Sequence, residues 1–205
     1  MFLTLYNLMS AVLWVVVLER TLVIYAFRGP WKVYFGVGDW LKNTQTLALL
    51  EVVFSLTGLV RAPVMTTAMQ VASRLFLVWG PVSQFTGIAG FSRAYSSMLF
   101  AWSVTEVIRY SFFAFSLGLG SVPDFLLWLR YNTFFVLYPI GITSECILIF
   151  KTISAALEQN FLLGALWVVV LFVYVPGSYI LYTHMMAQRR KVMRAQAEDK
   201  IQKTN

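Results

Sequence analysis

A tyrosine and a glutamate lie seven residues apart in an apolar stretch of the chain, with a proline directly after the tyrosine. Tyr138 and Glu145 would share one face of a helix, because seven residues make almost two turns, and about 10 Å would separate them along its axis. Pro139 removes a backbone hydrogen bond and bends a helix, and Gly141 adds flexibility. A phenol and a carboxyl group that converge at such a kink could move protons on one small substrate. The same pattern fits a proline kink that serves packing, with the tyrosine hydrogen-bonded locally.

Further ionisable side chains lie inside apolar stretches. They are Glu51, Arg74, Glu106, Arg109 and Arg130. A charge at the centre of a bilayer costs about 2.5–3.5 kcal/mol on insertion scales, so these residues are expected to face the inside of a helix bundle and to pair with one another. Glu106 and Arg109 share a helix face at i, i+3 and could pair directly. A purely structural role in joining helices explains that pair as well as a functional role does.

The residue inventory excludes several kinds of site. His184 is the only histidine and Cys146 the only cysteine, so neither a multi-histidine metal site nor an intrachain disulfide can form. The chain contains no G-x-x-x-x-G-K and no G-x-G-x-x-G sequence that could cradle a phosphate. No H-C-x-x-G-x-x-R signature surrounds Cys146, and we expect this thiol to be inert packing. We therefore expect neither a metal nor a cofactor.

Composition indicates a membrane protein. Of the 205 residues, 59% are hydrophobic and 12% are charged, whereas soluble domains carry about 25% charged residues. Gly36 and Gly38 belong to a predicted loop from Arg28 to Asn43, and other glycines and prolines separate further apolar stretches of about 20 residues, the length that crosses a bilayer. We expect spans at residues 2–27, 44–60, 65–85, 95–117, 125–150 and 161–182. The sequence thus predicts an all-α membrane protein, a six-helix transmembrane bundle over residues 1–187, followed by a basic tail at 188–205.

The distribution of lysine and arginine predicts the orientation. An even number of spans places both termini on one side, where Arg61 and the cations of the tail outnumber the cations of the opposite loops. We therefore predict that both termini and the tail are cytosolic. The net charge of +7 could indicate nucleic acid, but the cations lie among apolar spans and in a tail beside the membrane. This arrangement favours membrane lipid headgroups as the partner and argues against nucleic acid.

A series of short motifs runs along nearly the whole chain. The longest is L-R-Y-N-T-F-F-V-L-Y-P-I-G-I-T-S-E at Leu129–Glu145, and W-S-V-T-E-V-I-R-Y occupies Trp102–Tyr110. L-Y-N-L, R-A-P, Y-V-P-G and Q-R-R-K occur in the same order. Together these motifs resemble the 3-hydroxyacyl-CoA dehydratase family, also called the protein tyrosine phosphatase-like family. Ile140 and Ala62 depart from that family's pattern, and neither departure removes a catalytic group.

The resemblance implies six spans in the endoplasmic reticulum membrane and the third step of very-long-chain fatty acid elongation. This step is the dehydration of a (3R)-3-hydroxyacyl-CoA to the trans-2-enoyl-CoA by a lyase. The resemblance implies Tyr138 and Glu145 as its catalytic pair. We assign Glu145 as the base at C2 and Tyr138 as the proton donor to the C3 hydroxyl, and the opposite assignment stays open. Residues expected to support the site or bind substrate are Arg61, Arg74, Glu106, Arg109 and Arg130.

The expected partners are the acyl-CoA substrate, membrane lipid and enzymes of the elongase complex. In the predicted topology, Arg61 and the Gln188–Arg194 segment could meet the CoA phosphates. A span over 125–150 would place Tyr138 near mid-membrane and Glu145 deeper, so the pantetheine arm would have to pass inward between helices. The main alternative is a non-enzymatic membrane scaffold or adaptor of the same family. A small transporter is a third interpretation, but matching pairs of broken helices are missing from the sequence.

Overall fold

The computed structural model of the chain describes residues 1–60 and 62–204, with side chains to residue 195. Every regular element in this part of the chain is a helix. In order they are α1 (Phe2–Arg28), η1 (Pro30–Lys32), α2 (Val33–Leu47), α3 (Leu49–Leu56), α4 (Val64–Leu77), η2 (Val78–Val82), α5 (Thr86–Ala89), α6 (Arg93–Leu119), α7 (Asp124–Asn132), α8 (Phe134–Gln159) and α9 (Phe161–Thr204).

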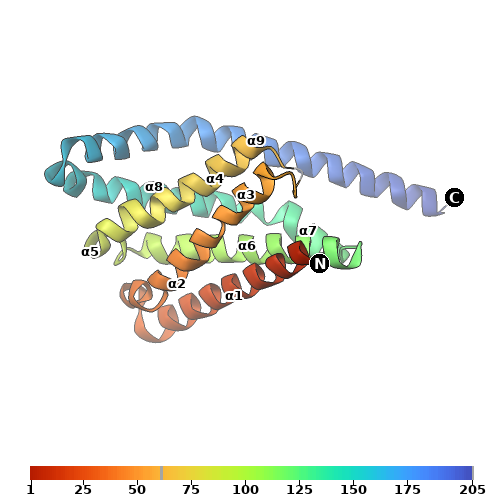
Figure 1. The fold of residues 1–205 in the computed structure, drawn as a ribbon, viewed down its shortest axis with the longest axis horizontal. Coiled ribbons are helices and arrows are strands. Elements are labelled where there is room, and N and C mark those ends of the chain that lie inside the picture. Colours follow the sequence, from red (N-terminus) through yellow and green to blue (C-terminus); the bar gives the residue numbers. More distant parts are fainter. Residues whose placement is uncertain (61, 205) are drawn as a thin grey trace.

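The helices form a bundle of long rods that run back and forth (Figure 1). α2 and α3 continue each other and run antiparallel to α1, and the π-turn η2 extends α4. α6 packs against α1 on one side and α8 on the other, and α9 returns along α8. Both termini therefore lie toward the same end of the bundle, and the turns from α1 to α2 and from α8 to α9 lie toward the opposite end (Figure 1).

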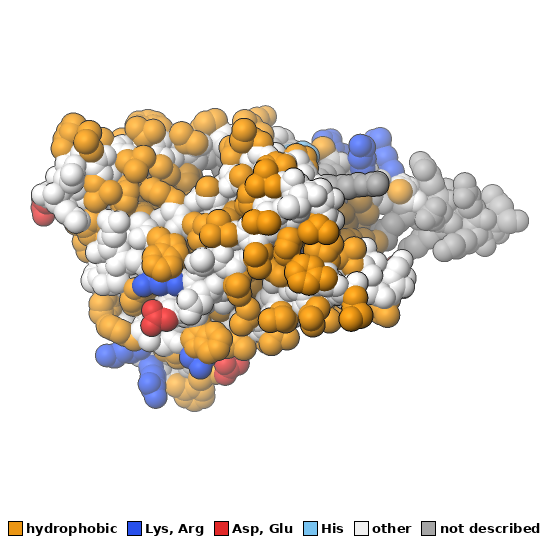
Figure 2. All heavy atoms as spheres, in the orientation of Figure 1, with side chains coloured by type: hydrophobic (Ala, Val, Ile, Leu, Met, Phe, Trp, Pro, Cys, Tyr) orange, Lys and Arg blue, Asp and Glu red, His pale blue; other side chains and the backbone are white. Residues whose placement is uncertain are grey.

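Three helices in the described residues are long and apolar enough to cross a membrane. They are α1, α8 and the Phe161–Ala195 part of α9. α6 has the length of α1 but carries Glu106 and Arg109 in its second half. The all-α prediction is confirmed, and three of the expected six spans meet the criteria of length and composition. Figure 2 shows apolar side chains over much of the visible face, with charged ones gathered mainly near its two ends.

The predicted loop from Arg28 to Asn43 is wrong, because most of it is helix α2. Only Gly29, with φ of 83°, makes the turn that a glycine favours, and η1 follows it directly. Gly36 lies inside α2, and its missing side chain lets α2 approach α1 closely. An added Cβ atom would collide with the side chain of Ile24 on α1. Glycine here therefore marks close helix packing and not a break.

The predicted fifth span, 125–150, is also wrong in its boundaries. A break at Thr133, whose hydroxyl donates to the Leu129 carbonyl at 2.8 Å, separates the short helix α7 from α8. α8 then continues to Gln159, and Asn160 alone connects it to α9, with its side-chain oxygen accepting the Leu162 amide at 2.8 Å. Asn160 thus caps the first turn of α9. The helix of this region that is long and apolar enough to cross a membrane, Phe134–Gln159, thus starts about nine residues later than the expected span.

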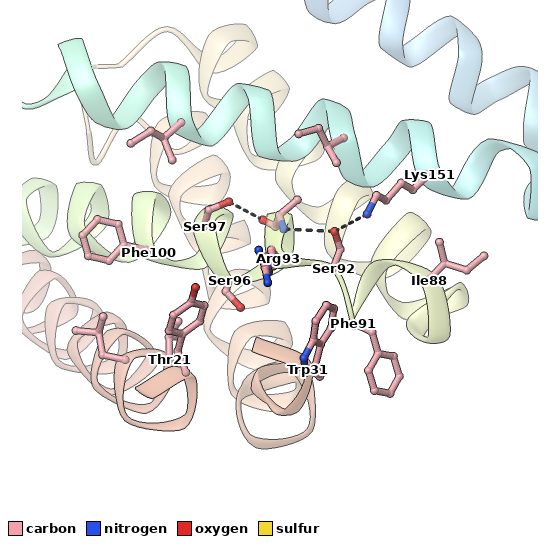
Figure 3. Close-up of a pocket in the computed structure, with 15 residues that line it drawn as sticks. Thr21, Trp31, Ile88, Phe91, Ser92, Arg93, Ser96, Ser97, Phe100 and Lys151 are labelled. Atoms are coloured by element: carbon pink, nitrogen blue, oxygen red, sulfur yellow. Dashed lines mark hydrogen bonds between the residues drawn. The ribbon is translucent and has the colours of Figure 1, made fainter. Parts of the chain in front are cut away.

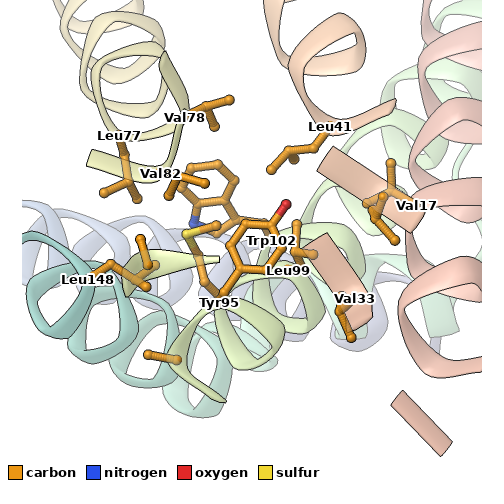
Figure 4. Packing of buried hydrophobic residues seen from close by; sticks show 14 of the residues in the cluster. Val17, Val33, Leu41, Leu77, Val78, Val82, Tyr95, Leu99, Trp102 and Leu148 are labelled. Atoms are coloured by element: carbon orange, nitrogen blue, oxygen red, sulfur yellow. The ribbon is translucent and has the colours of Figure 1, made fainter. Parts of the chain in front are cut away.

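The apolar core fills the half of the bundle away from the termini. Side chains of α1, α2, α4, η2, α6 and α8 meet there, with Val17, Leu41, Leu77, Leu99 and Leu148 fully buried (Figure 4). α6 supplies most of its core side chains from its first half, and Glu106 and Arg109 lie near its middle. The polar side chains described next therefore gather closer to the end that holds the termini.

Candidate functional site

Glu145 is held inside the bundle by two uncharged donors. Trp102 of α6 donates its indole N–H to Oε1 at 2.8 Å, and the phenol of Tyr174 on α9 donates to Oε2 at 2.8 Å. Among the described residues, Glu145 forms no ion pair. Both carboxylate oxygens are thus oriented without a neutralising cation in contact, which leaves the group able to accept a proton.

Tyr138 lies on α8 toward the end of the bundle that holds the termini. Its phenol donates to the Ser178 carbonyl of α9 at 3.0 Å, and its ring lies against Tyr182 with 5.9 Å between centroids. A cavity of about 350 Å³ opens beside it, lined by residues of α8 and α9 that include Thr143 and Tyr179. Because α8 begins at Phe134, the tyrosine lies only about 6 Å along the axis from the start of this helix.

The two predicted catalytic residues share a face of α8, as their spacing indicated. Their partners on α9, Ser178 and Tyr174, are four residues apart and therefore also share a face. Pro139 lies inside α8 without interrupting it, so the proline does not break the helix between the two groups. Tyr138 and Glu145 do not contact each other, and a substrate would have to lie between them.

A buried network of charges lies next to this face. Glu106, which is 2% exposed, accepts hydrogen bonds from Arg74 of α4 and, at 2.7 Å, from Nε of Arg109. The guanidinium of Arg109 also donates two hydrogen bonds, of 2.9 and 2.7 Å, to the carboxylate of Glu51 on α3, and the phenol of Tyr110 donates to the same carboxylate. The predicted Glu106–Arg109 pair is confirmed. Two arginines and two glutamates balance, so the cluster carries no net charge, as a low-dielectric interior requires.

Trp102 connects this network to Glu145. The guanidinium of Arg74 lies 5.0 Å from the centroid of the indole ring whose N–H binds Glu145. The cation–π contact and the hydrogen bond together fix the plane of the ring. Sequence reasoning did not single out Trp102 or Tyr174, although each begins one of the motifs quoted above, W-S-V-T-E-V-I-R-Y and Y-V-P-G.

The remaining predicted residues lie elsewhere. Arg130 stacks on Phe112 and Phe113, with centroid distances of 4.4 and 4.7 Å, and does not contact the catalytic candidates. Arg61 lies outside the described residues. Within the described residues, no arginine forms a hydrogen bond with the phenol of Tyr138. The same part of the chain brings together no group of acidic, histidine or cysteine side chains that could hold a metal ion.

One arginine of the tail packs close to the start of α8. Nε of Arg189 donates to the side-chain oxygen of Asn132 at 3.0 Å, and its guanidinium lies 5.3 Å from the ring of Phe135. Asn132 ends α7 and Phe135 is in the first turn of α8. A basic side chain of α9 is thus anchored within a turn of Tyr138.

The chain is similar to a group of known proteins along most of its length. Residues 45–195 match the family model described as protein tyrosine phosphatase-like protein, PTPLA. A Schizosaccharomyces pombe protein named "Probable very-long-chain (3R)-3-hydroxyacyl-CoA dehydratase" is 48% identical over 96% of this chain and 94% of its own length. The Caenorhabditis elegans "Very-long-chain (3R)-3-hydroxyacyl-CoA dehydratase hpo-8" is 40% identical over 94% of both chains. The Arabidopsis thaliana "Very-long-chain (3R)-3-hydroxyacyl-CoA dehydratase PASTICCINO 2" is 38% identical over 94% of this chain and 92% of its own. No solved structure gives a significant match.

Proposed function

We propose, because the chain belongs to the protein tyrosine phosphatase-like protein family, that it is a very-long-chain (3R)-3-hydroxyacyl-CoA dehydratase. The reaction is a lyase step that forms a trans-2-enoyl-CoA and water in fatty acid elongation. The observation on this chain that carries the proposal is Glu145, a carboxylate inside an apolar bundle that is oriented by two uncharged donors. Nothing in the chain or in its relatives favours the non-enzymatic scaffold.

The reaction needs a base at C2 and an acid at the C3 oxygen. Glu145 takes the C2 proton, the electron pair of that C–H bond forms the double bond, and the C3–O bond breaks. Tyr138 gives its proton to the departing hydroxyl, which leaves as water. Glu145 then releases its proton to water and the phenolate of Tyr138 takes one up from water, which restores both groups. General acid–base catalysis of this kind contributes about 10²–10⁴-fold.

Trp102 and Tyr174 have a positioning role in this mechanism. Their hydrogen bonds fix both oxygens of Glu145 before substrate enters, and the guanidinium of Arg74 lies against the indole ring of Trp102. Pre-organised groups of this kind contribute to rate by holding the base within about 0.5 Å of its productive position. Both donors are uncharged. They therefore stabilise the ionised form of the carboxylate less than an arginine would.

A topology of six crossings is part of the proposal. Four of the crossings would be single helices, namely α1, α6, α8 and α9, and the other two would be α2 continued by α3 and α4 continued by η2. At 1.5 Å per residue, α2 and α3 together measure about 36 Å and α4 with η2 about 28 Å, and the hydrocarbon core is about 30 Å thick. Both termini and the 188–205 tail would be cytosolic, in the endoplasmic reticulum membrane. Enzymes of the elongase complex and membrane lipid are the proposed neighbours.

The start of α8 supports a short path for the substrate. Because α8 begins at Phe134, Tyr138 lies about one turn from the start of this helix and would be closer than Glu145 to the end that carries the tail. Arg189, anchored at Asn132, lies at that same end and would meet the phosphates of CoA. The pantetheine arm would then extend inward along the cavity between α8 and α9, which Tyr138 and Ser178 line.

An assay on the purified protein tests the reaction and the pair. The full chain in detergent is incubated with a long-chain (3R)-3-hydroxyacyl-CoA, and the trans-2-enoyl product is followed. Tyr138→Phe and Glu145→Gln are each expected to be at least about 100-fold slower while remaining folded. Glu158→Gln, an exposed carboxylate of the same helix, is the matched control and keeps wild-type activity. Activity that survives both substitutions would refute the site, and a folded wild type without activity at any chain length would favour a scaffold.

A further inference from the structure

A second cavity, of about 780 Å³, is lined in part by the connections from α1 to α2 and from α5 to α6 (Figure 3), which lie toward the end of the bundle opposite the termini (Figure 1). α1, α6 and α8 form its walls, with Trp31 and Phe91 from the connections between helices. Leu22, Phe100 and Ile147 make its lining apolar. Phe100 and Ile147 are each 39% exposed, so the cavity opens along the apolar side of the bundle.

Two cations line this cavity without a partner of opposite charge. Neither Arg93 nor Lys151 forms an ion pair within the described residues. Nζ of Lys151 donates to the hydroxyl of Ser92 at 3.2 Å, and the guanidinium of Arg93 lies 5.9 Å from the ring of Trp31 (Figure 3). Arg28 and Lys32 also form no ion pair within the described residues, but they do not line this cavity, whereas Arg93 and Lys151 do.

The start of α6 adds further groups that attract an anion. Arg93 is the first residue of this 27-residue helix, whose N-terminal end carries a positive partial charge. Ser92 caps it by accepting the Ala94 amide. Ser96, one turn into α6, lines the same cavity, is 5% exposed, and has a hydroxyl without a hydrogen-bond partner among the described residues. A buried hydroxyl normally finds a partner, and here a bound anion would supply it.

We propose that this cavity binds an anionic membrane phospholipid. The phosphate group lies between Arg93 and Lys151 at the start of α6, within reach of the Ser96 hydroxyl, and one acyl chain lies along Phe100 and Ile147. The apolar lining distinguishes this site from one for free phosphate, which would need no such wall. The cavity extends along α8 as far as Ile140, but neither Tyr138 nor Glu145 lines it. The lipid site is therefore separate from the catalytic pair and does not depend on the proposed function.

Native mass spectrometry of the full-length protein in detergent tests this proposal. The probes are palmitoyl-oleoyl phosphatidylglycerol and the zwitterionic phosphatidylcholine with the same chains. We expect the wild type to bind phosphatidylglycerol at least about 10-fold more tightly than phosphatidylcholine. Each cation near a lipid headgroup accounts for about fivefold in affinity, so the double variant of Arg93→Gln and Lys151→Gln should bind phosphatidylglycerol about 30-fold more weakly.

The control removes two cations at the same end that do not line the cavity. Arg28→Gln with Lys32→Gln lowers the net charge by the same amount and should keep the affinity within about twofold. Equal binding of the two lipids by the wild type, or an unchanged preference in the variant of Arg93 and Lys151, would overturn the proposal. If that double variant does not fold, each single substitution should give its own fivefold loss.

Inorganic phosphate and a change in the apolar wall distinguish a lipid from a free anion. Phosphate at millimolar concentration should not displace phosphatidylglycerol, and Ile147→Trp should weaken the lipid by narrowing the channel for its acyl chain. Displacement by phosphate, or an Ile147 variant that binds the lipid as the wild type does, would overturn the assignment to a phospholipid. Dehydratase turnover measured on the same samples is a separate readout, so a missing lipid site and a missing activity remain distinguishable.

Discussion

Replacing Glu106 with glutamine should destabilise the protein more than any other single charge removal in the network. Glu106 is 2% exposed and contacts both arginines, whereas Arg74, Arg109 and Glu51 are 27, 29 and 17% exposed. Glu106→Gln leaves a net charge of +1 in the bundle and a free hydrogen-bond position on Arg74. Breaking a buried pair by removing one partner costs about 3–5 kcal/mol, which corresponds to a fall in Tm of about 6–20 °C for a chain of this size.

The second step of this experiment restores the charge balance. Arg74→Gln combined with Glu106→Gln leaves Arg109 paired with Glu51, so the cluster is again neutral. We expect the double variant to be more stable than the sum of its single variants by at least about 1 kcal/mol, the size of coupling between contacting residues. Thermal unfolding in detergent, followed by the retained monodisperse fraction, measures the three Tm values, and the dehydratase assay at a permissive temperature separates stability from rate.

An exposed ion pair with the same spacing is the control. Asp39 and Lys42 are also at i, i+3, at 3.9 Å, and the carboxylate of Asp39 is almost fully exposed. Asp39→Asn should change the Tm little or not at all, since exposed pairs contribute almost nothing. Additive losses in the variants of Arg74 and Glu106 would refute the reasoning that net charge in the interior governs the stability of this cluster.

Three further outcomes follow from other contacts. Tyr174→Phe and Trp102→Phe should each lower kcat about 10-fold with little change in KM, because each removes one hydrogen bond to the base; unchanged turnover would remove both from the site. Arg189→Gln should raise KM for the acyl-CoA several-fold, with a weaker salt dependence and the same kcat; an unchanged KM would move the CoA site elsewhere. Gly36→Ala should lower the Tm slightly, because the added methyl group forces the end of the Ile24 side chain to move, whereas Gly87→Ala, which meets open space, should not.

Local features of the sequence predicted the parts of this structure that depend on local geometry. The shared face of Tyr138 and Glu145 and the Glu106–Arg109 pair follow from helical periodicity alone. The all-α fold follows from composition. Gly36 shows the limit, because a glycine that breaks a helix and a glycine that admits a neighbouring helix look the same until the neighbour, here α1, is known.

The contacts around Glu145 could not be predicted in this way. Trp102 and Tyr174 are 43 and 29 residues away from it in sequence, and their arrangement depends on how α6 and α9 pack against α8. The ion pair of Arg74 with Glu106 likewise joins residues 32 apart. Sequence reasoning named the charged members of the network, because ionisable residues in apolar stretches are conspicuous, and missed the aromatic donors, because Trp and Tyr are common in membrane helices.

The placement of the balanced charges has a consequence for biosynthesis. Glu51, Arg74 and the Glu106–Arg109 pair belong to α3, α4 and α6, and none of these helices is among the three that are apolar enough to cross a membrane alone. The three helices that are apolar enough lie at the two ends of the chain: α1 comes first, and α8 and α9 come last. A newly made α3 or α4 would therefore enter lipid with an unpaired charge, at a cost of a few kcal/mol, until α6 is synthesised. We therefore expect α3, α4 and α6 to insert into the membrane together. In contrast, α1 and the hairpin of α8 and α9 can each insert on their own.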